Sequence, residues 1–438
     1  MVSVDLIFAL VFYGIILIIF FKTKKRWNIQ GILALYKTKI GINLMDKLAR
    51  KDKKNIILTG ITLTILGLIL TIIGLSSSQP YFTGIGSILL IIGLLMAVPI
   101  KVLGHAGTII GFFGMAFIFY ILIRSTITLI FVEGAESTIA PVLPGVKIPG
   151  LPILSFWHWI ISIFILALVH EFSHGILARV YKLKIKSSGI GFLGPILLAF
   201  VEPDEKQTAK AQKKAQLSMF AAGPFANIIL AVLALLFSMF ILAPLSEAIF
   251  DADGITVSNF TPGFPAEKSG LEVPFTIKSV NHIETLSVVD FVDATEGINP
   301  NQEIILNTDK GTAIITTIEN PDNSSKGLIG IQGLSQKTKT KENISEFQGK
   351  SFRWISMLFM WLFFINLGVG LFNLLPLGPV DGGRMFHVAT LKIFKNKKTA
   401  KKVWLFAMYL IIFLIIVNFI PWIIKLLKFI TGLISAAP

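Results

Sequence analysis

Long apolar runs recur along most of the chain. Runs near the ~20 residues that a bilayer-spanning helix needs lie at about 4–21, 56–75, 84–100, 107–131, 153–181, 216–247, 352–376 and 403–424. Unpaired peptide groups are costly in lipid, so each run is predicted to be helical. The pattern predicts a polytopic α-helical membrane protein of about eight spans.

The pattern changes between residues 250 and 345. Hydropathy drops there, and short alternating runs typical of strands (254–257, 275–280, 303–306 and 313–318) are separated by turn residues. We therefore expect a soluble α+β domain at 250–345, inserted between two spans. The remaining organisation is predicted as N-terminal helices at 1–132 and a membrane core in two parts, 153–247 and 352–438.

One apolar segment, 188–201, is too short to span a bilayer and contains three glycines and a proline. Irregular backbone at membrane depth needs cover from protein or a water-filled cavity. The segment is predicted to form a re-entrant hairpin that could pair with an extended substrate by strand addition. A hydrophobic loop on the cytoplasmic surface is the alternative.

Composition and charge narrow the class of protein. Hydrophobic residues make up 54% of the chain and charged residues 15%, well below the roughly 25% charged that is usual for soluble proteins. The net charge of +15 arises mainly from basic segments beside apolar runs, at 22–55, 182–215 and 377–402. These segments indicate cytoplasmic loops and not a nucleic-acid site. The N-terminus and the inserted domain are then expected outside the cell.

The candidate chemistry lies in the span at 153–181. Residues 170–174 read HEFSH, which places His170 and His174 one helical turn apart with Glu171 beside them. The chain has no cysteine, so a transition metal must use histidine and carboxylate ligands. Two His and a carboxylate with an open position are typical of catalytic zinc. A pair of purely structural histidines is the alternative.

A third ligand is expected near the cytoplasmic end of a later span. The segment 373–383, NLLPLGPVDGG, breaks the helix with prolines and glycines and contains Asp381. Asp381 is the predicted ligand; a helix N-cap is its alternative role. His387 is a second candidate donor, for which a solvated interfacial position is the simpler interpretation.

These motifs resemble those of the site-two protease family of intramembrane zinc metalloproteases. The resemblance covers about residues 153–384 and includes a third motif, AGPFAN at 222–227, which is similar to the family's Gly-Pro-x-x-Asn. It implies Zn²⁺ held by His170, His174 and Asp381, with Glu171 as general base. Gly378 and Val380 stand where many members have proline and leucine, and neither change removes a reacting group.

Two asparagines are candidates for substrate or oxyanion support. The resemblance, more than their chemistry, implies that Asn227 and Asn373 donate to the oxyanion or hold the substrate backbone. A hydrogen bond between helices is the alternative for each. In the inserted domain, the segment 263–271 is similar to the turn-and-helix signature of PDZ-like domains, which implies a peptide or protein partner.

The sequence thus predicts a zinc metalloendopeptidase that cuts membrane-anchored proteins within the lipid bilayer, near its cytoplasmic side. We expect a multi-pass protein of a prokaryotic plasma membrane. Two alternatives remain open: a scaffold or pseudoprotease that binds partners through the PDZ-like domain, and a membrane zinc protease acting on prenylated peptides. The intact Glu171 disfavours the first, and Asp381 in place of a glutamate-bearing helix disfavours the second.

Overall fold

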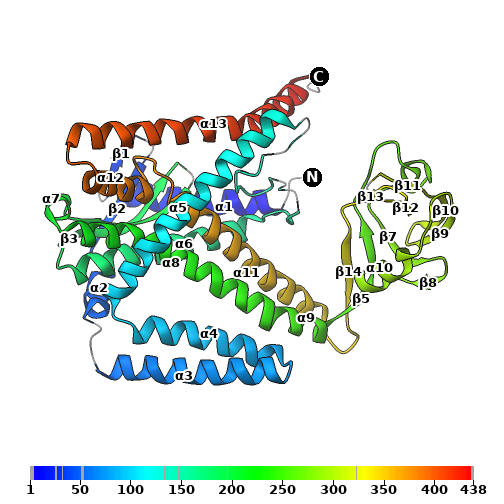
Figure 1. The fold of residues 1–438 in the computed structure, drawn as a ribbon, viewed down its shortest axis with the longest axis horizontal. Helices are drawn as coiled ribbons and strands as arrows, with labels where there is room; N and C mark the ends of the chain where they lie inside the picture. The colour runs from blue at the N-terminus through cyan, green and yellow to red at the C-terminus, as the bar shows by residue number, and fades with distance from the viewer. Residues whose placement is uncertain are drawn as a thin grey trace. The chain divides into compact units, whose positions relative to one another are not determined.

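A computed structural model describes residues 4–435, apart from 25–26, 32, 51–53, 133–134, 136, 147, 149, 195 and 322 (Figure 1). Parts of the predicted basic segment 22–55 and of the loop 132–152 therefore lie outside the described residues. The chain forms two compact units: Met1–Leu242 with Ser356–Pro438, and Ala243–Ile355. Each is described by itself.

Within the described residues, seven helical segments are long and apolar enough to cross a membrane. They lie in α3 (Lys54–Ser76), α4 (Pro80–Ala97), α5 (Ile100–Phe131), α6 (Phe156–Val180), α8 (Lys213–Phe237), α11 (Glu346–Phe372) and α13 (Lys397–Ser435). The apolar segment of α8 continues through the π-helical turn η2 (Ser238–Leu242) and α9 (Ala243–Ile249). The prediction of a polytopic membrane protein is thus supported at this level.

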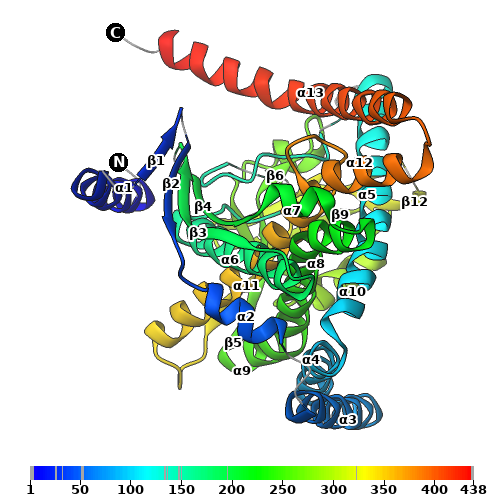
Figure 2. The same ribbon diagram turned by 90° about the vertical axis from the view of Figure 1, so that its left-hand side faces the viewer.

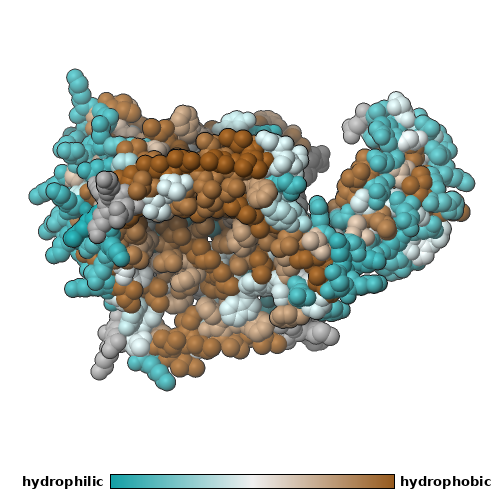
Figure 3. Space-filling view, turned by 90° about the horizontal axis from the view of Figure 1, so that it is seen from below, coloured by the Kyte–Doolittle hydropathy of each residue, from teal (hydrophilic) through white to brown (hydrophobic). Residues whose placement is uncertain are grey.

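The eighth predicted span, 4–21, forms α1 (Val4–Thr23), but its described apolar part, Ile7–Thr23, is shorter than the other seven. The count of eight spans therefore stays a prediction. Figure 3 shows apolar side chains spread across a face of the helical unit, with hydrophilic side chains gathered at one end of it. Such a broad apolar surface is expected of helices that face lipid.

A four-stranded antiparallel sheet, in the order β1-β2-β3-β4, lies beside α6 (Figure 2). Its strands are β1 (Trp27–Gln30), β2 (Leu33–Thr38), β3 (Ile185–Leu193) and β4 (Ile196–Pro203). The segment predicted as a re-entrant hairpin, 188–201, is the β3–β4 hairpin, and β2 pairs with β3 from Leu33↔Leu193 to Thr38↔Ser188. The interpretation of 22–55 as a topological loop missed β1 and β2, because two short strands among basic residues carry little periodic signal.

Short helices connect these elements. Helix α2 (Ile42–Ala49) follows β2, α7 (Glu205–Lys210) joins β4 to α8, and α12 (Asp381–Ile393) lies between α11 and α13. One buried cluster, Met115, Ala221, Leu374 and Met385, joins α5, α8 and α12. This packing fixes the start of α12 against α8, which places Asp381 beside His170 and His174 of α6.

The second unit contains a sheet in the order β10-β9-β7-β5-β14, with β8 paired to β7. Its elements are β5 (Phe250–Val257), β6 (Asn259–Phe260), η3 (Pro265–Lys268), β7 (Phe275–Val280), β8 (Ile283–Glu284), α10 (Val288–Glu296), β9 (Glu303–Thr308), β10 (Gly311–Thr316), β11 (Ile318–Asn320), β12 (Asn323–Leu328), β13 (Ile331–Gln332) and β14 (Ser335–Thr340). Alternating residues such as Ile255, Ile277 and Leu306 fill its core. The first three runs predicted as strands lie in β5, β7 and β9, and the fourth, 313–318, covers most of β10 and reaches the first residue of β11.

Asp309 makes an acid-sensitive contact in this second unit. Its Oδ1 accepts a 2.7 Å hydrogen bond from the Thr276 N–H, and Lys337 Nζ lies 3.4 Å from its Oδ2. Burial raises the pKa of the Asp309 carboxyl, but the Thr276 hydrogen bonds and Lys337 outweigh burial and hold the pKa below its ordinary value. A lowered folded-state pKa stabilises the fold above about pH 4 and ceases to do so as the pH falls through that pKa.

We therefore expect the second unit to lose more stability between pH 6 and pH 3 than it does in an Asp309→Asn variant. The difference should be under about 1 kcal/mol, because the carboxyl is partly exposed and screened. Hydrogen exchange of the β7 and β9 peptides in the full-length chain, referenced to unfolded peptides at each pH, measures this difference. Equal losses in the two proteins would contradict the assignment.

Candidate metal centre

Helix α6 positions the two histidines and the glutamate. Ser155 caps its N-terminus by accepting a hydrogen bond from the His158 N–H. The i, i+4 spacing places His170 and His174 on one face, and both side chains are buried. The pair therefore presents two imidazoles to the same point in the interior of the helical unit.

Asp381 approaches that point from the first turn of α12. The residue before it, Val380, occupies the N-cap position, so the alternative role of Asp381 as an N-cap is not what the structure shows. The Gly382 N–H donates a 2.7 Å hydrogen bond to the Asn373 carbonyl, which closes the loop 374–380 onto the helix. Asp381 is 8% exposed, and its carboxylate faces the histidines.

Three donor atoms meet at nearly equal distances. His170 Nε2 and His174 Nε2 each lie 3.1 Å from Asp381 Oδ2, and the two nitrogens lie 3.2 Å apart. Ligands about 2.0–2.1 Å from a tetrahedral zinc ion are separated by roughly 3.3 Å. The donor set and its spacing therefore fit zinc.

Helix α8 packs over the two imidazole rings and contacts the Nδ1 atom of each. His174 Nδ1 lies 2.6 Å from the Met219 carbonyl oxygen, and His170 Nδ1 lies 3.0 Å from the side-chain amide of Asn227. A Cβ built on Gly223 would lie 2.4 Å from His174 Nε2 and 2.6 Å from His170 Nε2. A glycine is therefore required where α8 crosses these two nitrogens. The Met219 carbonyl gives no signal in the sequence. Gly223 is the glycine of the Gly-Pro-x-x-Asn motif, but the motif alone does not indicate its steric role.

Glu171 lies beside the cluster in a cavity of about 300 Å³. Its Oε2 accepts a 3.1 Å hydrogen bond from the Val201 N–H of β4. The cavity is lined by the three candidate ligands and, among others, by Asn373, Val380 and Arg384. A carboxylate in this position can exchange a proton with a water molecule or an amine at the cluster.

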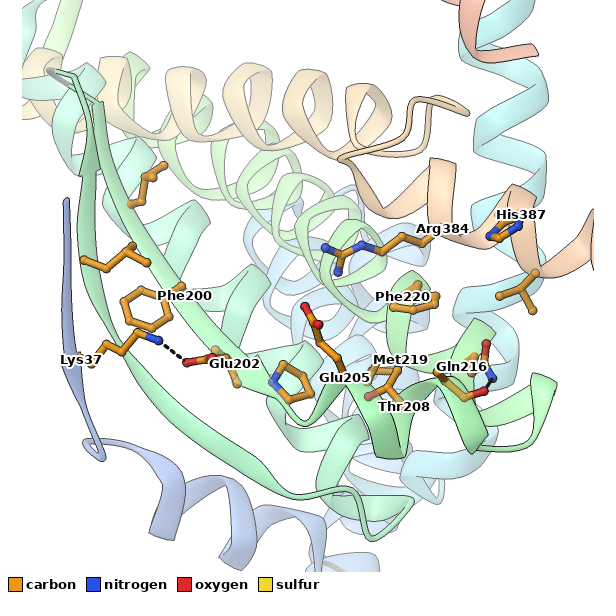
Figure 4. Close-up of a pocket in the computed structure, with 16 residues that line it drawn as sticks. Lys37, Phe200, Glu202, Glu205, Thr208, Gln216, Met219, Phe220, Arg384 and His387 are labelled. Carbon is orange, nitrogen blue, oxygen red and sulfur yellow. Dashed lines mark hydrogen bonds and ion pairs between the residues drawn. The ribbon is translucent and has the colours of Figure 1, made fainter. Parts of the chain in front are cut away.

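A second cavity, of about 830 Å³, shares Val201, Met219, Phe220 and Arg384 with the first. In Figure 4, β4 and α12 lie on opposite sides of it, and Arg384 projects into it from α12. Glu202 is neutralised there by Lys37, whose Nζ lies 2.8 Å from Oε2. The shared lining places the larger cavity next to the one that contains the candidate ligands, and Arg384 is a lining residue that the motifs did not identify.

The remaining predicted candidates, Asn227, Asn373 and His387, occupy different positions relative to the two cavities. Asn373 lines the cavity that contains Glu171, whereas Asn227 is 0% exposed and lies behind His170. His387 lines the larger cavity, with its ring 5.0 Å from that of Trp404, and is not part of the three-residue cluster.

A comparison with protein families covers the part of the chain that contains these residues. The model of peptidase family M50 matches residues 158–417, more than half of the chain. The chain belongs to peptidase family M50. This is the family of site-two membrane metalloproteases that the motifs indicated, so the resemblance is confirmed at family level. The matched range of the M50 domain contains all six predicted site residues.

Two curated relatives extend the comparison. "Uncharacterized protein MJ0971" of Methanocaldococcus jannaschii is 32% identical over 259 residues, which are 58% of this chain and 61% of that protein. "Putative zinc metalloprotease CA_C1796" of Clostridium acetobutylicum is 25% identical over 221 residues, 44% of this chain and 62% of that protein. The alignments with this M50 chain span about three fifths of the length of each relative.

Proposed function

We propose that the protein is an intramembrane zinc endopeptidase that hydrolyses peptide bonds of membrane-anchored proteins. The observation that carries the proposal is the cluster of His170, His174 and Asp381, whose donor atoms lie 3.1–3.2 Å apart. The similarity to a Clostridium protein named as a zinc metalloprotease supports the same metal.

His170, His174 and Asp381 would hold the zinc ion. Zinc in such a site supplies a Lewis acid that acidifies water and polarises a carbonyl oxygen. Glu171 takes a proton from the attacking water and delivers it to the leaving nitrogen, as a general base and then a general acid. The Asn373 side chain lines the same cavity and can donate a hydrogen bond to the carbonyl oxygen of the substrate.

The sheet supports a way to bind the extended substrate. β4 ends the strand order β1-β2-β3-β4, and residues 198 and 200–203 of this edge strand line the larger cavity. A peptide unwound from its helix can pair with the backbone groups of such an edge strand, apart from the Val201 N–H, which donates to Glu171 Oε2. We place the scissile bond between the Val201 edge of β4 and Asp381.

The proposed function includes a location for the protein and its site in the cell membrane. The site is proposed to lie near the cytoplasmic face, with the N-terminus and the unit Ala243–Ile355 outside, and the basic segments support this orientation. The membrane is proposed to be a prokaryotic plasma membrane. We interpret this unit as PDZ-like, because residues 263–271 form a turn and the short helix η3, and we assign it a peptide or protein partner.

The test is cleavage of a single-span model substrate by the purified full-length protein in detergent. We expect about one zinc ion per chain in the wild type and in Glu171→Gln. Cleavage should fall by about 10²–10⁴-fold in Glu171→Gln, which lacks the base, and should be lost on chelation and restored by added zinc.

Three outcomes would overturn the proposal. Undiminished cleavage by Glu171→Gln would remove the proposed base. Bound zinc without cleavage of any of a panel of single-span substrates would favour the scaffold that binds partners through the inserted unit. A prenylated peptide cleaved in preference to those substrates would favour the second alternative.

A further inference from the structure

Asn227 is held against the outer nitrogen of a candidate zinc ligand. It lies in α8, is 0% exposed, and places its side-chain amide 3.0 Å from His170 Nδ1. The opposite ring nitrogen, Nε2, is the one that faces Asp381. The other histidine is held in the same way, since its Nδ1 lies 2.6 Å from the Met219 carbonyl oxygen. Both imidazoles are thus oriented from α8.

The protonation of a neutral imidazole determines which side-chain amide atom of Asn227 can pair with His170 Nδ1. Only one ring nitrogen carries a proton, so a lone pair on Nε2 requires the proton on Nδ1 and an acceptor beside it. For His174 the Met219 carbonyl is that acceptor. For His170 the acceptor has to be Asn227 Oδ1. The structure places Asn227 Nδ2 at His170 Nδ1, which leaves Oδ1 buried without a hydrogen-bond partner among the described residues. Turning the amide by 180° exchanges the two atoms and gives Oδ1 the Nδ1–H as its partner.

We propose that Asn227 is a positioning residue for the metal site: its Oδ1 accepts the His170 Nδ1–H and fixes the tautomer whose Nε2 lone pair faces Asp381. The inference rests on the proposed zinc site. It assigns Asn227 a different role from substrate or oxyanion support. Asn227 is not among the residues that line the cavity containing Glu171, whereas Asn373 is. Of the two asparagines, Asn373 is therefore the one positioned to contact the substrate.

The test compares three variants by zinc affinity, measured by competition with a chromophoric chelator on the full-length protein in detergent. Asn227→Leu removes the acceptor and should weaken zinc binding about 10–100-fold, as losing a residue that orients a ligand commonly does. Asn227→Asp keeps an oxygen acceptor on Nδ1 and should bind zinc within a few-fold of wild type.

The matched control is Asn366→Leu. Asn366 is also 0% exposed, and its Oδ1 is also buried without a partner among the described residues, but its Nδ2 donates to the Leu362 carbonyl of its own helix. This variant reports the general cost of removing a buried amide and should keep wild-type zinc affinity. Size-exclusion chromatography in detergent verifies that all variants remain folded.

Each outcome has a distinct meaning. Wild-type affinity in Asn227→Leu, or an equal loss in Asn227→Asp and Asn227→Leu, would overturn the acceptor role. A wild-type chain that binds no zinc would overturn the proposed function together with this inference. Zinc bound with the expected order of affinities, but no cleavage of any substrate, would overturn the proposed function and leave the role of Asn227 intact.

Discussion

Gly223→Ala is expected to lose bound zinc while the helices remain folded. The new Cβ would lie 2.4 Å from His174 Nε2 and 2.6 Å from His170 Nε2, the two nitrogens that face Asp381. Contacts this short force the imidazoles or α8 to move, and either movement breaks the triangle of donor atoms. We expect zinc affinity to fall by at least about 100-fold, beyond the usual effect of losing a residue that orients a ligand, and cleavage to fall with it.

Gly368→Ala is the control for this prediction. Gly368 also lies in a membrane helix, α11, and a Cβ added there meets nothing within 4 Å. Alanine at this position should be neutral or stabilising by up to about 1 kcal/mol, because it has the higher helix propensity. Zinc content by atomic absorption and thermal unfolding in detergent measure both variants. A Gly223→Ala protein with one zinc per chain would show that α8 does not constrain the imidazoles.

The local part of the candidate site was predictable from sequence, because a helix fixes the relation between positions i and i+4. His170 and His174 needed only this periodicity to be placed together. Asp381, 207 positions beyond His174, was proposed from a break in a later apolar helix and from a motif, and the structure places it 3.1 Å from both rings.

The parts that the sequence did not reveal depend on the backbone or on long-range pairing. The contact beside His174 is made by the backbone carbonyl of Met219. Every residue has such a group, so no sequence pattern could identify it. Strand β2 pairs with β3 about 150 positions away, and its six residues are too few to stand out among lysines. Asn227 was found as part of a motif, but its motif could not tell whether the amide faces the substrate or His170.

A sharp contrast is expected between two glycines on either side of Asp381: Gly378 in the loop 374–380 and Gly383 in the first turn of α12. A Cβ on Gly383 would lie 1.6 Å from the Leu377 carbonyl oxygen, whereas one on Gly378 would lie 3.3 Å from Met408 Sδ, the nearest atom. Neither glycine is among the described residues with positive φ, so the difference is steric and not conformational. The Gly383 clash involves backbone, which cannot yield; the Gly378 contact involves a flexible thioether side chain, which can.

Gly383→Ala should therefore separate residues 374–380 from the start of α12 and move Asp381 away from the imidazoles. We expect a loss of stability of about 1–3 kcal/mol or more, typical of overpacking, together with loss of bound zinc. Gly378→Ala should keep the zinc and most of the cleavage. Unfolding in detergent with and without zinc separates the two effects, because only a chain that still binds the metal is stabilised by adding it. If zinc stabilised Gly383→Ala as much as Gly378→Ala, the close packing of this loop would not be what positions the third ligand.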